Sequence, residues 1–259
     1  MIMQDFFNYE KPILCAMVQC KTPEDCIKKI EDSIAEGAEA LGIQLCKLER
    51  QYRTREILTE IFSACKGLPI YITSYRKGAS DGYTDEECAD FLLFGLDCGL
   101  SVGSMMLCDV IGDLYGRSPY YELAVEESAV RRQKALIDEI HRRGGYVLMS
   151  SHTLKDVSTE ESVMIAKAHV ERGADIIKIV NKAESAASIP NHLRAIQRIT
   201  AMTDKKLLLL VSGEGQIVRY IGANFGVCMY LCVAYHNELD TKEQPTLARL
   251  KPIRENLPF

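Results

Sequence analysis

The sequence has no excess of positive charge and no cluster of basic residues. Its 31 lysines and arginines stand against 36 aspartates and glutamates, which leaves a formal net charge of −5. Chains that bind nucleic acid usually carry a basic surface, so no nucleic-acid partner is expected. No apolar run approaches the roughly 18 residues of a membrane span. The stretch from Met1 to Glu10 lacks the basic flank and apolar core of a signal peptide, so we expect no membrane partner and a cytoplasmic location.

Cysteine spacing typical of zinc sites is also missing, although the chain has ten cysteines. Cys15 and Cys20 straddle the end of one expected strand, and Cys228 and Cys232 lie four residues apart in another. Such spacings are rare in zinc sites. Without an export signal, the thiols are expected to stay reduced. The cysteines are therefore interpreted as small apolar core residues, and neither a metal ion nor a cofactor is predicted.

Short apolar or β-branched runs alternate with longer stretches of helical period along the whole chain. The expected strands are Ile13–Val18, Ala40–Leu45, Pro69–Thr73, Ser104–Val110, Tyr146–Ser151, Ile176–Val180, Lys206–Val211 and Val227–Val233. The expected helices are Pro23–Glu36, Thr54–Cys65, Asp85–Asp97, Glu122–Arg143, Glu160–Arg172, Ile189–Met202, Gln216–Asn224 and Thr246–Asn256. This alternation predicts an α/β fold, a single (β/α)8 TIM barrel that forms one domain over residues 1–259. A doubly wound open sheet would need a glycine-rich turn after the first strand, and residues 18–21 supply none.

Polar residues at the carboxyl ends of the expected strands are the candidates for chemistry, because barrel active sites lie there. Lys178 lies between Ile177 and Ile179 in the sixth strand. It either points inward as a nucleophile toward ketones or caps the strand rim beside Asp175. His152 follows the fifth strand, where it serves either as a proton carrier near neutral pH or as a loop histidine bonded to a neighbour. The two residues end consecutive strands, so we expect their side chains to converge over one pocket.

Three motifs lie around the ends of the fifth, sixth and seventh strands. They are Ser150-Ser151-His152, Gly173-Ala174-Asp175-Ile176-Ile177-Lys178-Ile179, and Ser212-Gly213-Glu214-Gly215-Gln216-Ile217-Val218-Arg219 with Phe225-Gly226 after it. In order and spacing they resemble the motifs of the type I 3-dehydroquinate dehydratases, and the likeness spans nearly the whole chain. The resemblance implies a Schiff-base lyase of the shikimate pathway, in which Lys178 forms an imine with the substrate ketone and His152 moves protons. It also implies that Arg219 binds the substrate carboxylate and that Gln244 covers the pocket.

The second and third expected strands depart from the pattern of that family. The family has Glu-x-Arg at the end of the second strand, whereas residues 44–46 read Gln-Leu-Cys here. By strand alternation, Gln44 and Cys46 should share one face, and they should hold substrate hydroxyls less firmly than the charged pair. The arginine expected after the third strand falls on Tyr75 in strict register, or on Arg76 with one inserted residue. The acid that orients the histidine falls on Asp81 with a one-place shift.

Three functions follow from these residues, and the sequence leaves them open. The first is a lyase that dehydrates a cyclic β-hydroxy ketone carboxylate, 3-dehydroquinate by default. The second is a Schiff-base lyase or aldolase that acts on a different keto acid, which Gln44 and Cys46 favour. The third is a non-catalytic barrel that binds a carboxylated metabolite. The expected partner is thus a small carboxylated ketone, and a homodimer is the assembly common among barrels of this type.

Overall fold

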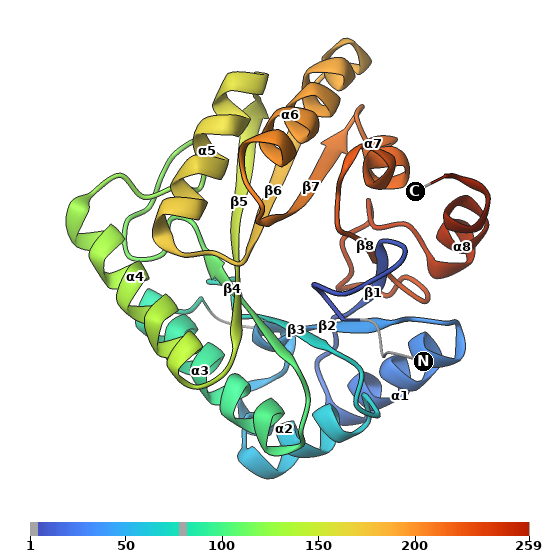
Figure 1. Cartoon of the computed structure of the whole chain (residues 1–259). Coiled ribbons are helices and arrows are strands. Elements are labelled where there is room, and N and C mark those ends of the chain that lie inside the picture. Colours follow the sequence, from blue (N-terminus) through green and yellow to red (C-terminus); the bar gives the residue numbers. More distant parts are fainter. Residues whose placement is uncertain (1–4, 78–81, 259) are drawn as a thin grey trace. The chain divides into compact units, whose positions relative to one another are not determined.

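A computed structural model describes residues 5–77 and 82–258 of the chain (Figure 1). Eight strands form one sheet in the order β7-β6-β5-β4-β3-β2-β1-β8. The pairs β1–β2, β2–β3, β3–β4, β5–β6 and β6–β7 are parallel. This is the strand order of a (β/α)8 barrel, as the alternation of the sequence predicts. The residues group into two compact units, and one domain over residues 1–259 stays a prediction.

The first unit comprises the described residues up to Asp109, together with Ile140–Tyr146 and Leu231–Asn256. Its complete elements are β1 (Ile13–Val18), α1 (Pro23–Ala35), β2 (Ala40–Gln44), α2 (Arg55–Ser63), β3 (Ile70–Thr73), α3 (Asp85–Ser101) and α8 (Leu247–Asn256), with 3-10 turns at Leu45–Lys47 and Arg50–Tyr52. Strands β4 (Met106–Ile111) and β8 (Met229–Cys232) contribute residues to both units, as does helix α4 (Glu127–Arg142).

Helix α1 begins where the sequence predicts. The side chain of Thr22 accepts a hydrogen bond from the backbone N–H of Asp25, and Pro23 occupies the first turn, where its missing N–H is not needed. The helix packs on β1 and α2. All six residues of β1 are buried, as expected of a parallel strand covered on both faces. These contacts position the carboxyl end of β1.

The second unit comprises residues 110–139, 147–230 and 257–258. Its elements are β5 (Tyr146–Asp156), α5 (Thr159–Arg172), β6 (Ile176–Ala183), α6 (Ile189–Met202), β7 (Lys206–Gly213) and α7 (Val218–Ile221), with 3-10 turns at Ala186–Ser188 and Gly222–Phe225. Helices α5 and α6 pack against each other, α5 against β6 and α6 against β7 (Figure 1). Helix α5 ends at Gly173, whose φ of 100° suits a residue without a side chain.

Several element boundaries in the second unit differ from those expected, and three of the differences lie near candidate residues. Strand β5 continues to Asp156, so His152 lies within the strand and not after it. The predicted helix from Glu122 to Arg143 begins only at Glu127, because residues before it run beside β5 and Glu122 has a φ of 45°. The expected helix over residues 216–224 is divided into α7 and a 3-10 turn. The first two differences both lie beside His152.

Candidate functional site

The register between β5 and β6 puts Lys178 and His152 on the same face of the sheet. Ser150 pairs with Lys178, and His152 pairs with Val180. Paired residues of neighbouring strands point to the same side, and residues two apart share a face. Lys178 therefore lies diagonally from His152, one pleat along the strand. The lysine is 4% exposed, so its side chain is shielded from solvent.

A carboxylate contacts His152 from a segment that the sequence assigned to a helix. Oε2 of Glu122 accepts the backbone N–H of His152 at 2.8 Å and is hydrogen-bonded to Nδ1 of the same residue. The sequence motifs did not identify Glu122. One signal could have done so: residues 112–126 separate β4 from α4, whereas βα loops usually have roughly 2–6 residues, and long loops are often functional.

Several hydrogen bonds hold the segment that carries Glu122 against other residues of the second unit. The carbonyl of Glu122 accepts from Oγ of Ser151 at 2.9 Å. The guanidinium of Arg172, which is buried, donates to the carbonyl of Gly112 at 2.9 Å, to the side chain of Gln133 at 2.8 Å and to the carbonyl of Ala124. These contacts satisfy both ends of the segment and set the position from which Glu122 reaches the histidine.

Arg219 lies on the short helix α7, after the turn that follows β7. Its side chain is 6% exposed, and Nε donates to the carbonyl of Val211 at 2.9 Å. Lys178 pairs with Leu208 on β7, three residues before Val211. The hydrogen bond fixes one edge of the guanidinium to β7. Whether Arg219 binds a carboxylate remains a prediction.

In the first unit, Gln44 is the last residue of β2, and Cys46 lies in the 3-10 turn that follows. The expectation that both residues lie in one strand, and share a face by alternation, was wrong because the strand ends at Gln44. The two side chains nevertheless meet, since Nε2 of Gln44 lies 3.5 Å from Sγ of Cys46. Cys46 is fully buried, whereas Gln44 is half-buried. Their roles in substrate binding remain predictions.

Tyr75 and Arg76, which follow β3, each contact a carboxylate. The hydroxyl of Tyr75 donates to Oδ2 of Asp109 at 2.6 Å, and the buried Tyr71 donates to the same oxygen. Arg76 bonds through Nε to Oδ1 of Asp85 at 2.6 Å. The two candidates for the third-strand position therefore contact different carboxylates. Asp81 lies outside the described residues.

Gln244 precedes α8 and is 7% exposed. Its Oε1 accepts from Nε2 of Gln19, which follows β1, at 3.5 Å. The contact joins residues that follow two strands, β8 and β1, which are neighbours in the sheet. Gln244 therefore lies near the carboxyl end of β1, and its contact with a substrate stays a prediction.

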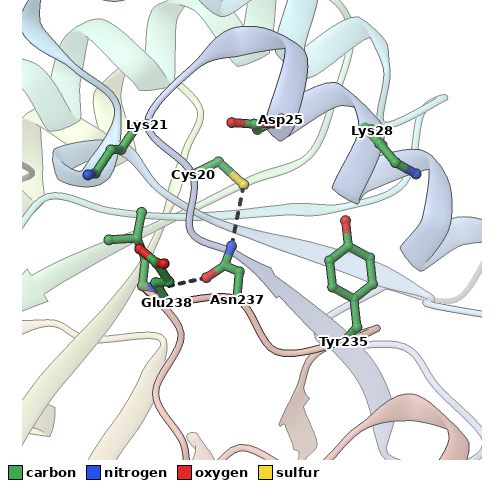
Figure 2. A pocket seen from close by; sticks show the side chains of 8 residues that line it. Cys20, Lys21, Asp25, Lys28, Tyr235, Asn237 and Glu238 are labelled. Carbon is green, nitrogen blue, oxygen red and sulfur yellow. Dashed lines mark hydrogen bonds between the residues drawn. The ribbon is translucent and has the colours of Figure 1, made fainter.

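A pocket of about 300 Å³ opens in the first unit beyond β1. Figure 2 shows the side chain of Asn237 directed toward Cys20, at 3.9 Å between Nδ2 and Sγ. The rest of the lining is Lys21, Asp25, Lys28, Tyr235, Glu238 and Leu239. It mixes both charges and contains none of the predicted site residues that the structure describes.

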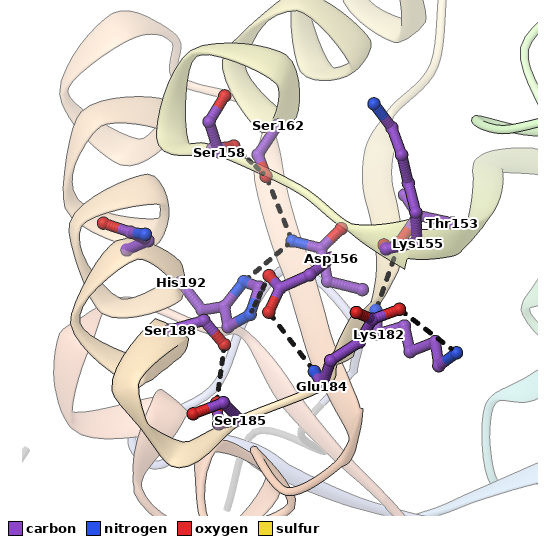
Figure 3. A network of polar contacts seen from close by, with 12 residues as sticks. Thr153, Lys155, Asp156, Ser158, Ser162, Lys182, Glu184, Ser185, Ser188 and His192 are labelled. Carbon is purple, nitrogen blue, oxygen red and sulfur yellow. Dashed lines mark hydrogen bonds and ion pairs between the residues drawn. The ribbon is translucent and has the colours of Figure 1, made fainter.

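A second polar cluster lies on the helix-covered face of the second unit (Figure 3). Asn181 is an odd number of residues from Lys178 on β6, so it points to the opposite face. Its Nδ2 donates to Oγ of Ser162 on α5 at 3.0 Å and lies 3.2 Å from Nδ1 of His192 on α6. Nε2 of His192 is 3.6 Å from Oδ1 of Asp156. This cluster joins β6 to its covering helices, on the face away from Lys178.

Two statements hold for residues 5–77 and 82–258, which the structure describes. No group of three or more His, Cys, Asp or Glu side chains in this part of the chain could hold a metal ion. None of its helices combines the length and the apolar character needed to cross a membrane.

Sequence comparison connects the chain to known proteins. The family model described as Type I 3-dehydroquinase matches residues 118–257, which are more than half of the chain. A 3-dehydroquinate dehydratase of Klebsiella pneumoniae subsp. pneumoniae is 24% identical over 229 residues, which cover 86% of this chain and 85% of that protein. The region that the family model matches, residues 118–257, includes Glu122, His152, Lys178 and Arg219.

Solved structures resemble the chain over nearly its whole length. The 3-dehydroquinate dehydratase of Geobacillus kaustophilus HTA426 has a TM-score of 0.79 at 15% identity, covering 96% of this chain and 92% of that one. The type I enzyme of Clostridium difficile, solved with covalent modified comenic acid, has a TM-score of 0.77 at 16% identity, covering 95% and 92%. At such identities the likeness shows the fold, which is the (β/α)8 barrel.

Proposed function

Because this chain belongs to the type I 3-dehydroquinase family, we propose that it is a carbon–oxygen lyase that dehydrates 3-dehydroquinate through an imine at Lys178. One observation carries the assignment: Lys178 and His152 lie on adjacent strands and face the same side of the sheet. An amine and a proton carrier in that relation are the two groups that an imine-forming dehydration needs.

The proposed chemistry divides into steps that these two side chains can perform. The neutral amine of Lys178 adds to the substrate ketone, and loss of one water with uptake of one proton, which is released again when the imine is hydrolysed, leaves a protonated imine. The imine withdraws electrons, so the neighbouring C–H is acidified and His152 takes its proton. The β-hydroxyl then leaves as water with a proton returned by His152, and a second water hydrolyses the imine and frees Lys178.

Substrate binding is assigned to side chains at the ends of several strands. Arg219 is the proposed carboxylate anchor, since a guanidinium matches a carboxylate by two parallel hydrogen bonds. Gln244 is the proposed cover, and Gln44, Cys46 and Arg76 are the proposed contacts to the ring. The ion pair of Arg76 with Asp85 supports a role in which the arginine is held in place before substrate arrives.

Borohydride trapping tests the covalent step. The protein is mixed with 3-dehydroquinate and sodium borohydride, and the modified peptide is identified by mass spectrometry. We expect an adduct on Lys178 that disappears in Lys178→Ala. Lys182→Ala is the matched control, because this lysine lies on the same strand, four residues after Lys178, and its side chain is 48% exposed. Trapping that persists in Lys178→Ala contradicts the proposal, and absence of any adduct favours a non-catalytic binding barrel.

His152→Ala tests the proton transfers separately from imine formation. The variant is expected to turn over 3-dehydroquinate about 10²-fold more slowly, the usual range for lost acid–base catalysis. Its melting temperature should change little, because His152 is half-buried at the face of β5 and Glu122 retains its bond to the backbone N–H. An unaltered rate removes His152 from the mechanism.

A lyase acting on a different keto acid is the second candidate, and Gln44 and Cys46 favour it. They replace one negative and one positive side chain, which weakens the polar hold on ring hydroxyls. We expect a high KM for 3-dehydroquinate and a lower one after Gln44→Glu with Cys46→Arg. A micromolar KM in the unaltered chain excludes this candidate, and a panel of cyclic keto acids in the trapping assay identifies the substrate.

Location and assembly belong to the same proposal. We place the chain in the cytoplasm, where its ten cysteines, all buried, would stay reduced. We also propose a homodimer, which sedimentation at several protein concentrations tests. A mass equal to one chain at all concentrations contradicts it.

A further inference from the structure

We propose that Glu122 is the positioning residue of His152, and that it fixes which ring nitrogen of the histidine exchanges protons with the substrate. The inference rests on the proposed function, since it concerns the proton carrier of that reaction. The motif resemblance assigns the orienting acid to the segment after the third strand, at Asp81. The structure instead brings a carboxylate to the ring from the segment between β4 and α4.

One oxygen of Glu122 makes both contacts to His152. Oε2 accepts the backbone N–H at 2.8 Å and is bonded to Nδ1 of the ring. A carboxylate is an acceptor, so the ring proton must lie on Nδ1. The remaining nitrogen, Nε2, then carries the lone pair that removes a proton from the substrate. Because the shared oxygen joins the ring to its own backbone, it restricts rotation of the imidazole as well as its tautomer.

The backbone around Glu122 supports a positional role. Its φ of 45° is uncommon for a residue with a side chain, and such conformations persist where the surrounding contacts determine them. Oγ of Ser151, the neighbour of His152, donates to the carbonyl of Glu122 at 2.9 Å. At Gly112 an added Cβ would lie 2.5 Å from that same carbonyl oxygen. Glycine is therefore required for the segment to approach β5 this closely.

Two further backbone contacts join the segment to β5, one on each side of His152 along the strand. The backbone N–H of Leu154 donates to the carbonyl of Tyr120 at 3.0 Å, and the N–H of Gly112 donates to the carbonyl of Ser150 at 2.6 Å. His152 lies between these two positions on the strand. The carboxylate is thus carried by a segment whose backbone is bonded to the same strand as its target, which leaves little freedom in their relative position.

Two readouts separate positioning from a purely structural role, and both use the full-length chain. In the first, proton–nitrogen NMR spectra of protein labelled with ¹⁵N-histidine report the tautomer of each ring. We expect His152 to carry its proton on Nδ1, and to shift toward the Nε2–H form in Glu122→Gln. The second readout is steady-state turnover of 3-dehydroquinate, where Glu122→Gln should lower kcat about tenfold to a hundredfold with KM changed little. Borohydride trapping at Lys178 should persist, because imine formation does not depend on the orientation of His152.

Controls and rival assignments decide the outcome. Glu126→Gln removes an exposed carboxylate from the same segment and should match the unaltered chain. Glu122→Asp keeps the charge and is expected to restore part of kcat. The proposal is overturned if Glu122→Gln leaves both kcat and the His152 tautomer unchanged, or if Asp81→Asn lowers kcat while Glu122→Gln does not. If the unaltered chain shows no trapping, the proposed function fails. The tautomer comparison then decides the role of Glu122 alone.

Discussion

The ion pair between Lys29 and Asp240 yields the sharpest prediction of stability. It joins α1 to the segment before α8, with 2.5 Å between Nζ and Oδ2 and side chains that are 1% and 0% exposed. Oδ2 of Asp240 also accepts the N–H of Asn237 at 2.7 Å, and the ammonium lies 5.4 Å from the ring centre of Tyr235. Neither charge reaches water, so removal of one partner leaves the other buried without compensation.

The size of the effect follows from that burial. Removing one partner of a buried pair usually lowers the free energy of unfolding by about 3–5 kcal/mol. Lys29→Met keeps most of the side-chain volume, so the loss is mainly electrostatic. In a chain of this length such a loss lowers the melting temperature by roughly 6–20 °C. The double variant Lys29→Met with Asp240→Asn buries no charge and should be more stable than Lys29→Met alone.

Equilibrium unfolding in urea, followed by far-ultraviolet circular dichroism, measures these differences. The control is Lys28→Met, one position earlier on α1, whose ion pair with Asp32 has side chains 70% and 36% exposed. Water already screens that pair, so its loss should fall within the error of measurement. The reasoning is refuted if Lys29→Met is as stable as Lys28→Met, or if the losses in the double variant simply add.

Three further predictions concern single side chains. Burial lowers the pKa of His192 below its usual 6.5, so the unfolded chain takes up the proton more readily and stability should fall as the pH drops below about 6.5. Urea titrations at pH 7 and pH 5 check this, and an equal loss in His192→Gln contradicts it. Arg219→Met should raise the KM for 3-dehydroquinate about tenfold to a hundredfold, and an unchanged KM excludes the anchor role. A hydrogen bond with Cys26 lowers the pKa of the Cys20 thiol, which lines the pocket in Figure 2, so limiting iodoacetamide should alkylate Cys20 first. Peptide mass spectrometry reports the site, and earlier labelling of another cysteine contradicts this prediction.

Much of the fold could be predicted because its signals are local. Buried strands appear as short apolar runs, and helix starts appear as cap residues such as Thr22. The ends of β5, β6 and β7 were placed too early, because each apolar run is followed at once by polar residues: His152, Asn181 and Ser212. The end of β2 was placed one residue too late. The 3-10 turn at Leu45–Lys47 closes through the N–H of Leu48 and the carbonyl of Leu45, a hydrogen bond that no residue type signals.

The candidate site residues also divide into those with a local sequence signal and those set by long-range contacts. Lys178 and His152 could be named because Lys178 interrupts one apolar run and His152 follows another, and their common face follows from the register of two neighbouring strands. Glu122 could not, because its contact with His152 joins residues thirty positions apart. Helical period continues smoothly from α4 back to Glu122 in the sequence, so period alone assigns this residue to the helix. Glu122 lies outside the helix because residues 112–124 make long-range hydrogen bonds to β5, Gln133 and Arg172, which the sequence does not signal.

The distribution of the cysteines makes the chain its own reporter of unfolding. All ten thiols are buried, and Cys228 is the only one of them in the second unit. A thiol reagent such as Ellman's therefore reads mainly the opening of the first unit, whereas modification of Cys228 reads the second. Quantitative mass spectrometry of labelled peptides across a urea series would separate the two. If Cys228 and the remaining cysteines become reactive at the same urea concentration, the chain unfolds as one cooperative body; if they differ, each unit has its own stability.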